Sequence, residues 1–264
     1  MSTNKVIKVF LGVPVHKGET SASTCSSVIQ ASSCSYTVQF QILGLSLLAK
    51  NFNILFCNAW RKNFDYFALL HSDIGVQQPA TGTSWVESMI RRMIDLKAAV
   101  VAAVPPIKSP AGHTSTALEL EAGNPYNMRR MTVREMHELP YDIISREDLC
   151  AKFGVSNDRA GALLINTGCL VMDLRNYDWC GAQWPGFNIY DKIVWNTSRR
   201  PESYTVPEDW ALSRWLHIQK WPYYALRDIG IHHFGHVDYN NNTLWGEESD
   251  TFCGQISPEE YERT

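Results

Sequence analysis

The chain has 264 residues, of which 45% are hydrophobic and 19% are charged, and its net charge at pH 7 is −3. This balance is typical of a globular protein and provides no general attraction to nucleic acid or to anionic membranes. No apolar run reaches the length of a membrane-spanning helix, and the first residues do not have the pattern of a signal peptide. The seven cysteines form no CxxC pair, which indicates neither a disulfide framework nor a zinc ribbon and fits a reducing cytoplasm.

Apolar runs and amphipathic stretches alternate in the first 105 residues. The predicted strands, in chain order, are residues 8–15, 36–43, 66–70 and 98–104. A helix is predicted over 46–60 from its 3.6-residue apolar spacing, and another is predicted to begin at a capping box formed by Ser84 and Glu87. The serine-rich stretch 19–35 is compatible with a short helix or with turns. Alternating strands and helices of this kind predict an α/β protein with a mixed, mainly parallel sheet flanked by helices.

The second half of the chain is less regular. Residues 118–153 give no secure assignment, and residues 162–174 are predicted to form two short strands separated at Asn166-Thr167-Gly168. A second capping box, Thr205 to Glu208, predicts a helix that continues to about residue 219, and a last strand is predicted over 223–231. With no repeat or long linker, we expect one domain over 1–264. Its parts are a first half (about 1–105), a second half (about 106–246) and a polar tail (247–264).

The sequence His71-Ser72-Asp73 directly follows the predicted strand 66–70. In an extended chain, side chains two residues apart point to the same face, so His71 and Asp73 are expected to project together from the carboxyl end of the strand. In open α/β sheets, ligands bind at this edge. Imidazole and carboxylate groups are metal ligands, and a divalent ion held there can bind a diphosphate. The alternative is that Ser72 or Asp73 simply caps the following element.

Three further polar clusters lie at the ends of predicted elements. Lys50 and Asn51 lie near the start of the helix 46–60, where they either contact a phosphate or are simply solvated. Glu208 and Asp209 begin a helix, a position that the helix dipole alone favours for acidic residues. The stretch 232–236 contains three histidines next to an aromatic residue, which either bind a metal or pack at the end of a strand.

The order of these clusters resembles that of the GT-A fold glycosyltransferases, especially the family-2-like enzymes. The resemblance covers most of residues 5–240 and departs from the common pattern at His71, where that pattern has aspartate. The matching segments are Val13-Pro14, Ala49-Lys50-Asn51, His71-Ser72-Asp73, Thr167-Gly168-Cys169, Glu208-Asp209 and His233-Phe234-Gly235.

The resemblance implies an enzyme, a hexosyltransferase-like glycosyltransferase, that moves a sugar from a UDP- or GDP-linked donor. The residues that would bind the donor are Val13, Pro14, Lys50, Asn51, Ser72, Asp73, Thr167 and Gly168. The metal would be Mn²⁺ or Mg²⁺, although an imidazole ligand also suits zinc, cobalt and nickel. Its ligands would be His71, Asp73 and His233, with His236 as the second choice for the third ligand.

The chemistry of glycosyl transfer gives each cluster a role. A divalent ion neutralises the leaving diphosphate, and an inverting reaction needs a base for the acceptor hydroxyl. Glu208 and Asp209 are the candidate bases. They are about 100° apart on a helix, so only one of them can face the site. We expect Asp209 to be the base, because Glu208 fits the capping box begun by Thr205.

Other functions remain open on the sequence alone. A nucleotidyltransferase that makes nucleotide sugars has a related fold, but residues 13–18 are a poor version of its glycine-rich loop. A metallohydrolase built on the late histidines lacks a HExxH motif, and a sugar- or nucleotide-binding domain without catalysis is a further alternative. The acceptor and the stereochemical course stay undetermined. The absence of a basic patch argues against long nucleic acid, whereas a modified base stays possible.

Overall fold

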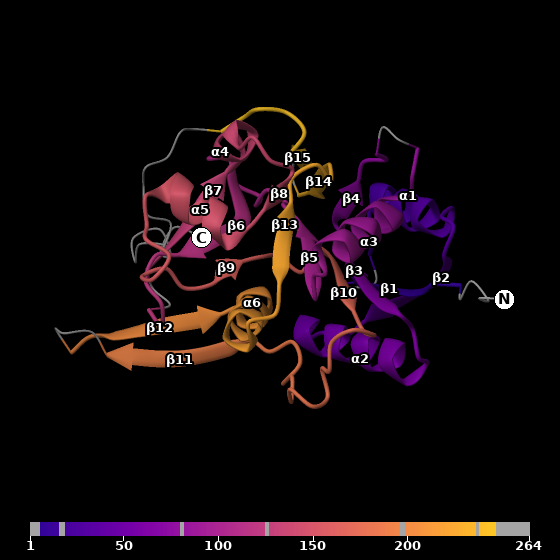
Figure 1. Cartoon of the computed structure of the whole chain (residues 1–264), viewed down its shortest axis with the longest axis horizontal. Helices are drawn as coiled ribbons and strands as arrows, with labels where there is room; N and C mark the ends of the chain where they lie inside the picture. Colours follow the sequence, from indigo (N-terminus) through magenta and orange to yellow (C-terminus); the bar gives the residue numbers. More distant parts are fainter. Residues whose placement is uncertain are drawn as a thin grey trace.

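A seven-stranded sheet forms the centre of the structure, with helices on both of its faces (Figure 1). The computed structural model describes residues 6–15, 19–79, 82–124, 127–195, 199–235 and 238–246. The described helices are α1 (Ala22–Ser32), α2 (Leu48–Arg61), α3 (Trp85–Leu96), α4 (Val133–Glu138), α5 (Arg146–Phe153) and α6 (Glu208–Gln219). The prediction of an α/β protein is therefore confirmed.

The order of the strands in the central sheet is β2-β1-β3-β10-β5-β13-β8. These strands are β1 (Lys8–Val15), β2 (Thr37–Gly44), β3 (Tyr66–Leu70), β5 (Val100–Ala103), β8 (Ile143–Ile144), β10 (Cys169–Asp173) and β13 (Tyr223–Leu226). The pairs β1–β2, β1–β3 and β5–β13 are parallel, whereas β10 is antiparallel to both β3 and β5, and β13 is antiparallel to β8. The sheet is therefore mixed, as predicted, but not mainly parallel, because β10 enters between β3 and β5 in the opposite direction. Because β2 and β3 lie on opposite sides of β1, the strand order reverses at β1, and ligands of α/β proteins bind beside such a reversal.

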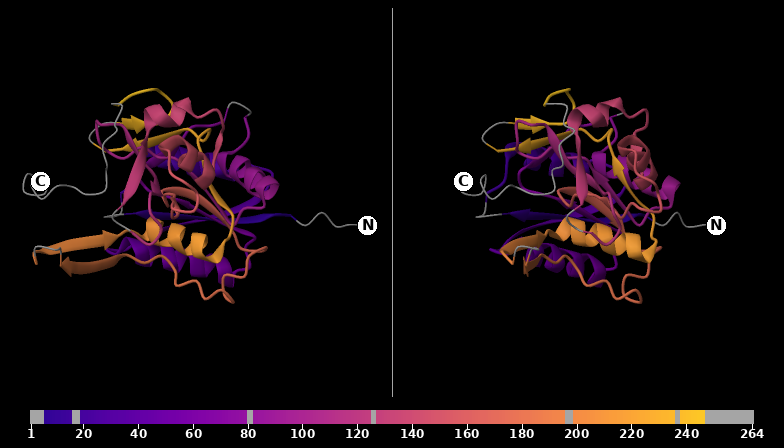
Figure 2. Two further views of the ribbon diagram at one scale, coloured as in Figure 1. Left: turned by 60° about the vertical axis from the view of Figure 1, so that its left-hand side comes forward. Right: turned by 90° about the vertical axis from the view of Figure 1, so that its left-hand side faces the viewer.

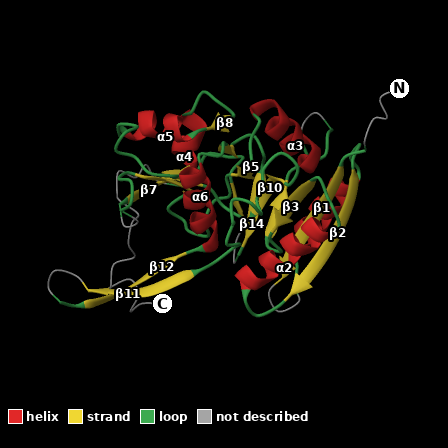
Figure 3. Ribbon diagram, turned by 60° about the horizontal axis from the view of Figure 1, so that its bottom comes forward, coloured by secondary structure: helices red, strands yellow, loops and turns green. Residues whose placement is uncertain are grey.

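Smaller sheets extend this core. One consists of β4 (Ile74–Val76), β14 (Ile231–Phe234) and β15 (Asp238–Asn240), and a second consists of β6 (His113–Glu119), β7 (Met128–Thr132) and β9 (Leu163–Leu164). The strands β11 (Tyr190–Trp195) and β12 (Pro201–Val206) form a hairpin that extends from the body of the molecule (Figure 3). No helix among the described residues is both long and apolar enough to cross a membrane.

Two apolar layers cover the faces of the sheet, because alternate residues of β1 point to opposite sides. Val9 and Leu11 pack in one layer, with the buried residues of α1 and α3, whereas Phe10 packs in the other, with those of α2 and α6. Figure 2 shows α6 beside α2 beneath the sheet. At Gly12, a Cβ atom would lie only 3.0 Å from Leu55 Cδ1, so the glycine lets α2 pack closely against β1.

Four strands and two helices of the first half lie where the sequence predicted them. The stretch left open at 19–35 forms α1, which begins with a hydrogen bond from Thr24 N to Ser21 Oγ of 3.0 Å. The predicted last strand is in fact two strands, β13 and β14, which belong to different sheets.

Both predicted capping boxes are wrong, although the helices begin close to the predicted positions. Neither Ser84, at the start of α3, nor Thr205, before α6, makes the capping hydrogen bond. Glu87 instead accepts hydrogen bonds from the backbone and side chain of Ser35. Complete capping boxes occur in the region that the sequence left unassigned, at the starts of α4 and α5.

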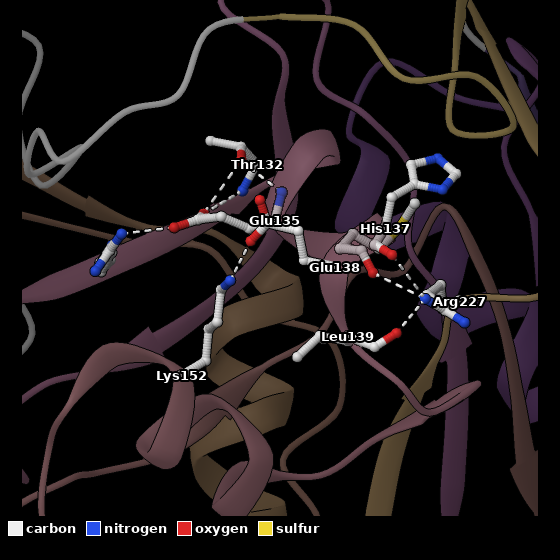
Figure 4. Close-up of polar contacts among 9 residues, drawn as sticks. Thr132, Glu135, His137, Glu138, Leu139, Lys152 and Arg227 are labelled. Atoms are coloured by element: carbon white, nitrogen blue, oxygen red, sulfur yellow. Dashed lines mark hydrogen bonds and ion pairs between the residues drawn. The ribbon is translucent and has the colours of Figure 1, made fainter.

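The polar cluster around α4 is structural (Figure 4). At the first turn, Thr132 and Glu135 form the capping box, and Arg129 binds Glu135 at 2.6 Å. At the last turn, Arg227 donates hydrogen bonds to the carbonyl groups of His137 and Leu139, which the helix leaves without partners. Lys152 of α5 pairs with Glu138. The cluster thus joins α4 to α5 and to the end of β13.

Tryptophans of the second half pack together in an aromatic cluster. Trp179 lies at the centre of an aromatic cluster, with ring centroids 5.6 Å from Trp215 and 4.9 Å from Trp221. Trp184 joins the cluster at 5.1 Å and also contacts Phe56 of α2 at 4.5 Å. This cluster packs α6 and the segment after β10 against α2.

Candidate functional site

Several loops meet at the carboxyl edge of the central sheet. The turn 71–73 follows β3 and the loop 104–112 follows β5, and these two strands point the same way. Since β10 runs in the opposite direction and Cys169 pairs with Leu70, the segment before it, 166–168, lies at the same edge. The chain thus brings three separate polar segments together beside the point where the strand order reverses.

The turn His71-Ser72-Asp73 is held by main-chain hydrogen bonds on three sides. His71 N donates to Gly168 O at 2.8 Å, and Phe234 N donates to Asp73 O at 2.8 Å. The carbonyl of Ser72 accepts from Ser21 N at 2.8 Å, at the start of α1. The structure therefore places Ser72 in the site through its backbone, and it fixes the positions from which His71 and Asp73 project.

Asp73 is the centre of a charged cluster. Its Oδ2 atom lies 2.6 Å from Lys108 Nζ and 3.4 Å from His233 Nε2. The other ring nitrogen of His233, Nδ1, lies 2.7 Å from the carbonyl oxygen of Pro106, which can only accept, so Nδ1 donates. The contact with Pro106 orients the ring so that Nε2 faces Asp73. Asp73 and His233, which are far apart in the sequence, therefore face each other.

The surroundings fix the charge states of Asp73 and His71. Burial alone would raise the pKa of Asp73, but hydrogen bonds from His233 and Lys108 outweigh it and hold that pKa far below its usual range. Burial lowers the pKa of His71 to about 4, although the nearby charge of Asp73 acts in the opposite direction. At neutral pH, Asp73 is therefore a carboxylate and His71 a neutral imidazole, the forms in which these groups bind metals.

Thr167 connects this turn to the acidic pair on α6. Its hydroxyl oxygen lies 3.5 Å from His71 Nε2 and donates to Glu208 Oε1 at 3.2 Å. The neighbouring Asn166 donates from Nδ2 to Asp209 Oδ2 at 2.9 Å and accepts from Gly168 N at 2.6 Å. The segment 166–168 therefore carries a continuous polar path from the start of α6 to the His71 turn.

A close approach explains the glycine in this segment. A Cβ atom at Gly168 would lie 2.5 Å from Ile74 Cδ1 and 2.6 Å from Asn166 Oδ1. Both distances are below van der Waals contact, so a larger residue would push β4 or Asn166 out of place. Gly168 therefore lets the segment approach the His71 turn.

Glu208 and Asp209 form a buried acidic pair, 7% and 8% exposed. Burial, and then repulsion from Glu208, raises the pKa of Asp209 to about 7, and burial also raises the pKa of Glu208. The expected reason for preferring Asp209 as the base was wrong, because Glu208 binds Thr167 rather than forming a capping box with Thr205. Asp209 has both oxygens occupied, by Trp210 N and Asn166 Nδ2.

The fit of a divalent ion depends on Asp73 and His233. Within the described ranges, no three His, Cys, Asp or Glu side chains gather as a metal site, so the predicted set of His71, Asp73 and His233 does not form one in this arrangement. Two of the three do converge. His233 donates Nδ1–H to a backbone carbonyl and directs Nε2 at Asp73, which is the orientation that second-shell hydrogen bonds give to metal-binding histidines. Asp73 and His233 are thus two side chains of the kinds that bind divalent ions, and in this arrangement they contact each other.

The remaining predicted donor-binding residues lie on β1 and α2. Lys50 is in the first turn of α2 and lines a groove of about 540 Å³ that runs along the helix. Asn51 is 1% exposed, and its side chain donates to Leu45 O at 3.2 Å, so it holds the β2–α2 connection. Val13 and Pro14 are buried at the end of β1. The loop 16–18, His236 and the tail 247–264 lie outside the described residues.

Sequence reasoning missed two residues of the cluster. Asn166 stands beside the matched Thr167-Gly168 pair, and its position at a break between two strands was a usable signal. Lys108 is a single lysine between prolines, 35 residues from Asp73, and nothing local to it indicates a site.

Comparisons with known proteins add little. No protein-family model matches the chain, and a search of curated proteins finds no match. Among solved structures, one that matches is titled "Crystal Structure of A197 from STIV". It is 10% identical, with a TM-score of 0.49, over 93% of this chain and 100% of that chain. A likeness of this degree bears on neither the fold family nor the activity of this chain.

Proposed function

We propose that the chain is a GT-A-type glycosyltransferase that uses a nucleotide-diphosphate sugar. The observation that supports this most is the convergence, at one edge of the sheet, of Asp73 and His233 with the buried pair Glu208–Asp209. A charged group suited to a diphosphate and an acidic group suited to an acceptor hydroxyl are the two parts that this reaction requires. Thr167, which lies between them, links the two parts.

The donor side of the proposed site consists of Asp73, His233 and Lys108. Asp73 and His233 would hold a divalent ion, which supplies positive charge to the leaving diphosphate when it is bound. His71, neutral at pH 7, lies behind this pair and contacts Thr167. Phe52 of α2 packs against the His71 ring at a centroid distance of 5.1 Å, which keeps the imidazole in one orientation.

The acceptor side consists of Glu208 and Asp209. A base works best when its pKa is close to the working pH, and the pKa of Asp209 is raised to about 7. In an inverting reaction, one carboxylate of the pair takes the proton of the acceptor hydroxyl while the new glycosidic bond forms. Glu208 is hydrogen-bonded to Thr167, which connects it to the donor side. We therefore assign removal of the acceptor proton to the pair rather than to Asp209 alone.

The test is the release of UDP or GDP from nucleotide sugars, with Mn²⁺ or Mg²⁺ present and no acceptor added. Wild-type protein should release nucleotide from at least one donor, and Asp73→Ala should abolish the release. Asp191→Ala is the matched control, because it removes the same charge from the β11–β12 hairpin, outside the carboxyl edge. If neither wild type nor control releases nucleotide from any donor, or if Asp73→Ala releases it as fast as wild type, the proposed function is wrong.

A further inference from the structure

Lys108 makes the shortest contact of Asp73, although its sequence context gives no sign of it and the proposed function assigns it no separate role. Its Nζ atom lies 2.6 Å from Asp73 Oδ2, with 37% of the lysine side chain and 40% of the aspartate side chain exposed. The ammonium group therefore forms an ion pair with the carboxylate, and both groups remain accessible to solvent. A ligand arriving at Asp73 meets this cation first.

The position of Lys108 is built into the surrounding loop. The loop is tied to β6 by Ile107 N, which donates to His113 O at 2.9 Å, and by Ser115 N, which donates to Pro105 O at 2.9 Å. The methylene chain of Lys108 lies along Gly235, where a Cβ atom would be 3.0 Å from Lys108 Cδ. The segments that carry His233 and Lys108 therefore pack on each other, and the same loop orients both side chains toward Asp73.

One carboxylate oxygen cannot serve two cations equally well. A divalent ion bound to Asp73 would stand close to the ammonium group, and the repulsion between them would weaken the binding of the ion. When a diphosphate is also present, its oxygens offer the ammonium group a new partner. A lysine acts as a point charge on a flexible stem, which lets it move from a carboxylate to a phosphate without rearrangement of the loop.

We propose that Lys108 is the resident cation of this site, holding Asp73 in the unliganded protein and turning to a phosphate oxygen when a diphosphate binds. This inference rests on the proposed function for the identity of the ligand. It has two consequences. The protein binds a diphosphate without added metal, and removing the ammonium group makes Mn²⁺ alone bind more tightly.

The test uses calorimetric titration of the full chain with three probes: inorganic pyrophosphate in EDTA, UDP in EDTA, and Mn²⁺ alone. Wild type is also titrated with UDP and with GDP in the presence of Mn²⁺. Lys108→Met removes the charge and keeps an apolar stem against Gly235, whereas Lys108→Arg keeps the charge. Lys152→Met is the matched control, because Lys152 also pairs with one carboxylate, that of Glu138, but lies on α5.

We expect Lys108→Met to bind pyrophosphate and UDP at least tenfold more weakly than wild type, and Mn²⁺ at least tenfold more tightly. Lys108→Arg and Lys152→Met should stay within about threefold of wild type for both anionic probes. Equal behaviour of Lys108→Met and Lys152→Met, or no metal-free binding of either anion by wild type, overturns the inference. If UDP and GDP also fail to bind in the presence of Mn²⁺, the proposed function fails with it; if they bind, only the role of Lys108 is lost.

Discussion

Replacing Asp209 by asparagine removes one charge from the buried pair and keeps the shape of the side chain. In the folded protein, burial and then the charge of Glu208 raise the pKa of Asp209 from 3.8 to about 7. Between these values the folded protein holds a proton that the unfolded chain has released, so wild type loses stability as the pH rises. At about 1.4 kcal/mol for each pKa unit, the shift from 3.8 to about 7 corresponds to a loss of about 4–5 kcal/mol in total, and about 3 kcal/mol of it falls between pH 5 and pH 8.

The hydrogen bonds of Asp209 determine how stable Asp209→Asn is relative to wild type at pH 5, where the comparison begins. Asparagine can still accept from Trp210 N, but its amide group would face the Nδ2 donor of Asn166, a mismatch that costs about 1–3 kcal/mol. We therefore expect Asp209→Asn to be less stable than wild type at pH 5 and to equal or exceed it at pH 8. Groups away from the pair titrate alike in both proteins, so the difference between them reports on position 209 and its interaction with Glu208.

Urea unfolding from pH 5 to pH 8 measures this difference directly. Asp191→Asn, which removes a charge from an exposed strand, is the control and should follow wild type across the range. A stability difference between Asp209→Asn and wild type that stays constant with pH would refute the reasoning, since it would mean that Asp209 is already ionised throughout.

Other changes test separate parts of the site. Glu208→Gln and Asp209→Asn should each slow sugar transfer by roughly 10²–10⁴-fold with little change in nucleotide affinity. Near-wild-type rates in both variants would mean that the pair only begins the helix and does not act as a base. Asp73→Ala should cost no more than about 1 kcal/mol of unfolding free energy, because its ion pair is exposed. Gly168→Ala should lose about 1–3 kcal/mol through the clash with Ile74, and an unchanged midpoint in urea would contradict that packing.

The first half of the fold was predictable because its signals are local. β1, β3 and β5 are buried on both faces, so they read as continuous apolar runs, and α2 shows its buried face at regular spacing. Residues 118–153 were not predictable for the opposite reason. Strands there are short, and β8 has only two residues and pairs with the distant β13, so too few residues are present for a pattern to emerge.

The candidate site was predictable only in part. The turn at Asp73 and the acidic pair on α6 could be found because polar residues interrupt apolar patterns there. The capping boxes could not be predicted, because Glu87 and Glu208 bind Ser35 and Thr167 instead of the backbone at the start of their helices. Lys108 reaches the site from another loop, and the local sequence pattern does not indicate a tertiary contact of this kind.

The central claim is that the carboxyl edge binds a nucleotide diphosphate at Asp73. A thermal-unfolding titration with UDP and GDP, each with and without Mn²⁺ or Mg²⁺, tests it most directly. We predict that one nucleotide stabilises wild type, by roughly 2.7 kcal/mol at a hundred times its dissociation constant, with a larger effect in the presence of metal. Asp73→Ala should lose this stabilisation and Asp191→Ala should keep it. No stabilisation of wild type by either nucleotide with any metal would contradict the account.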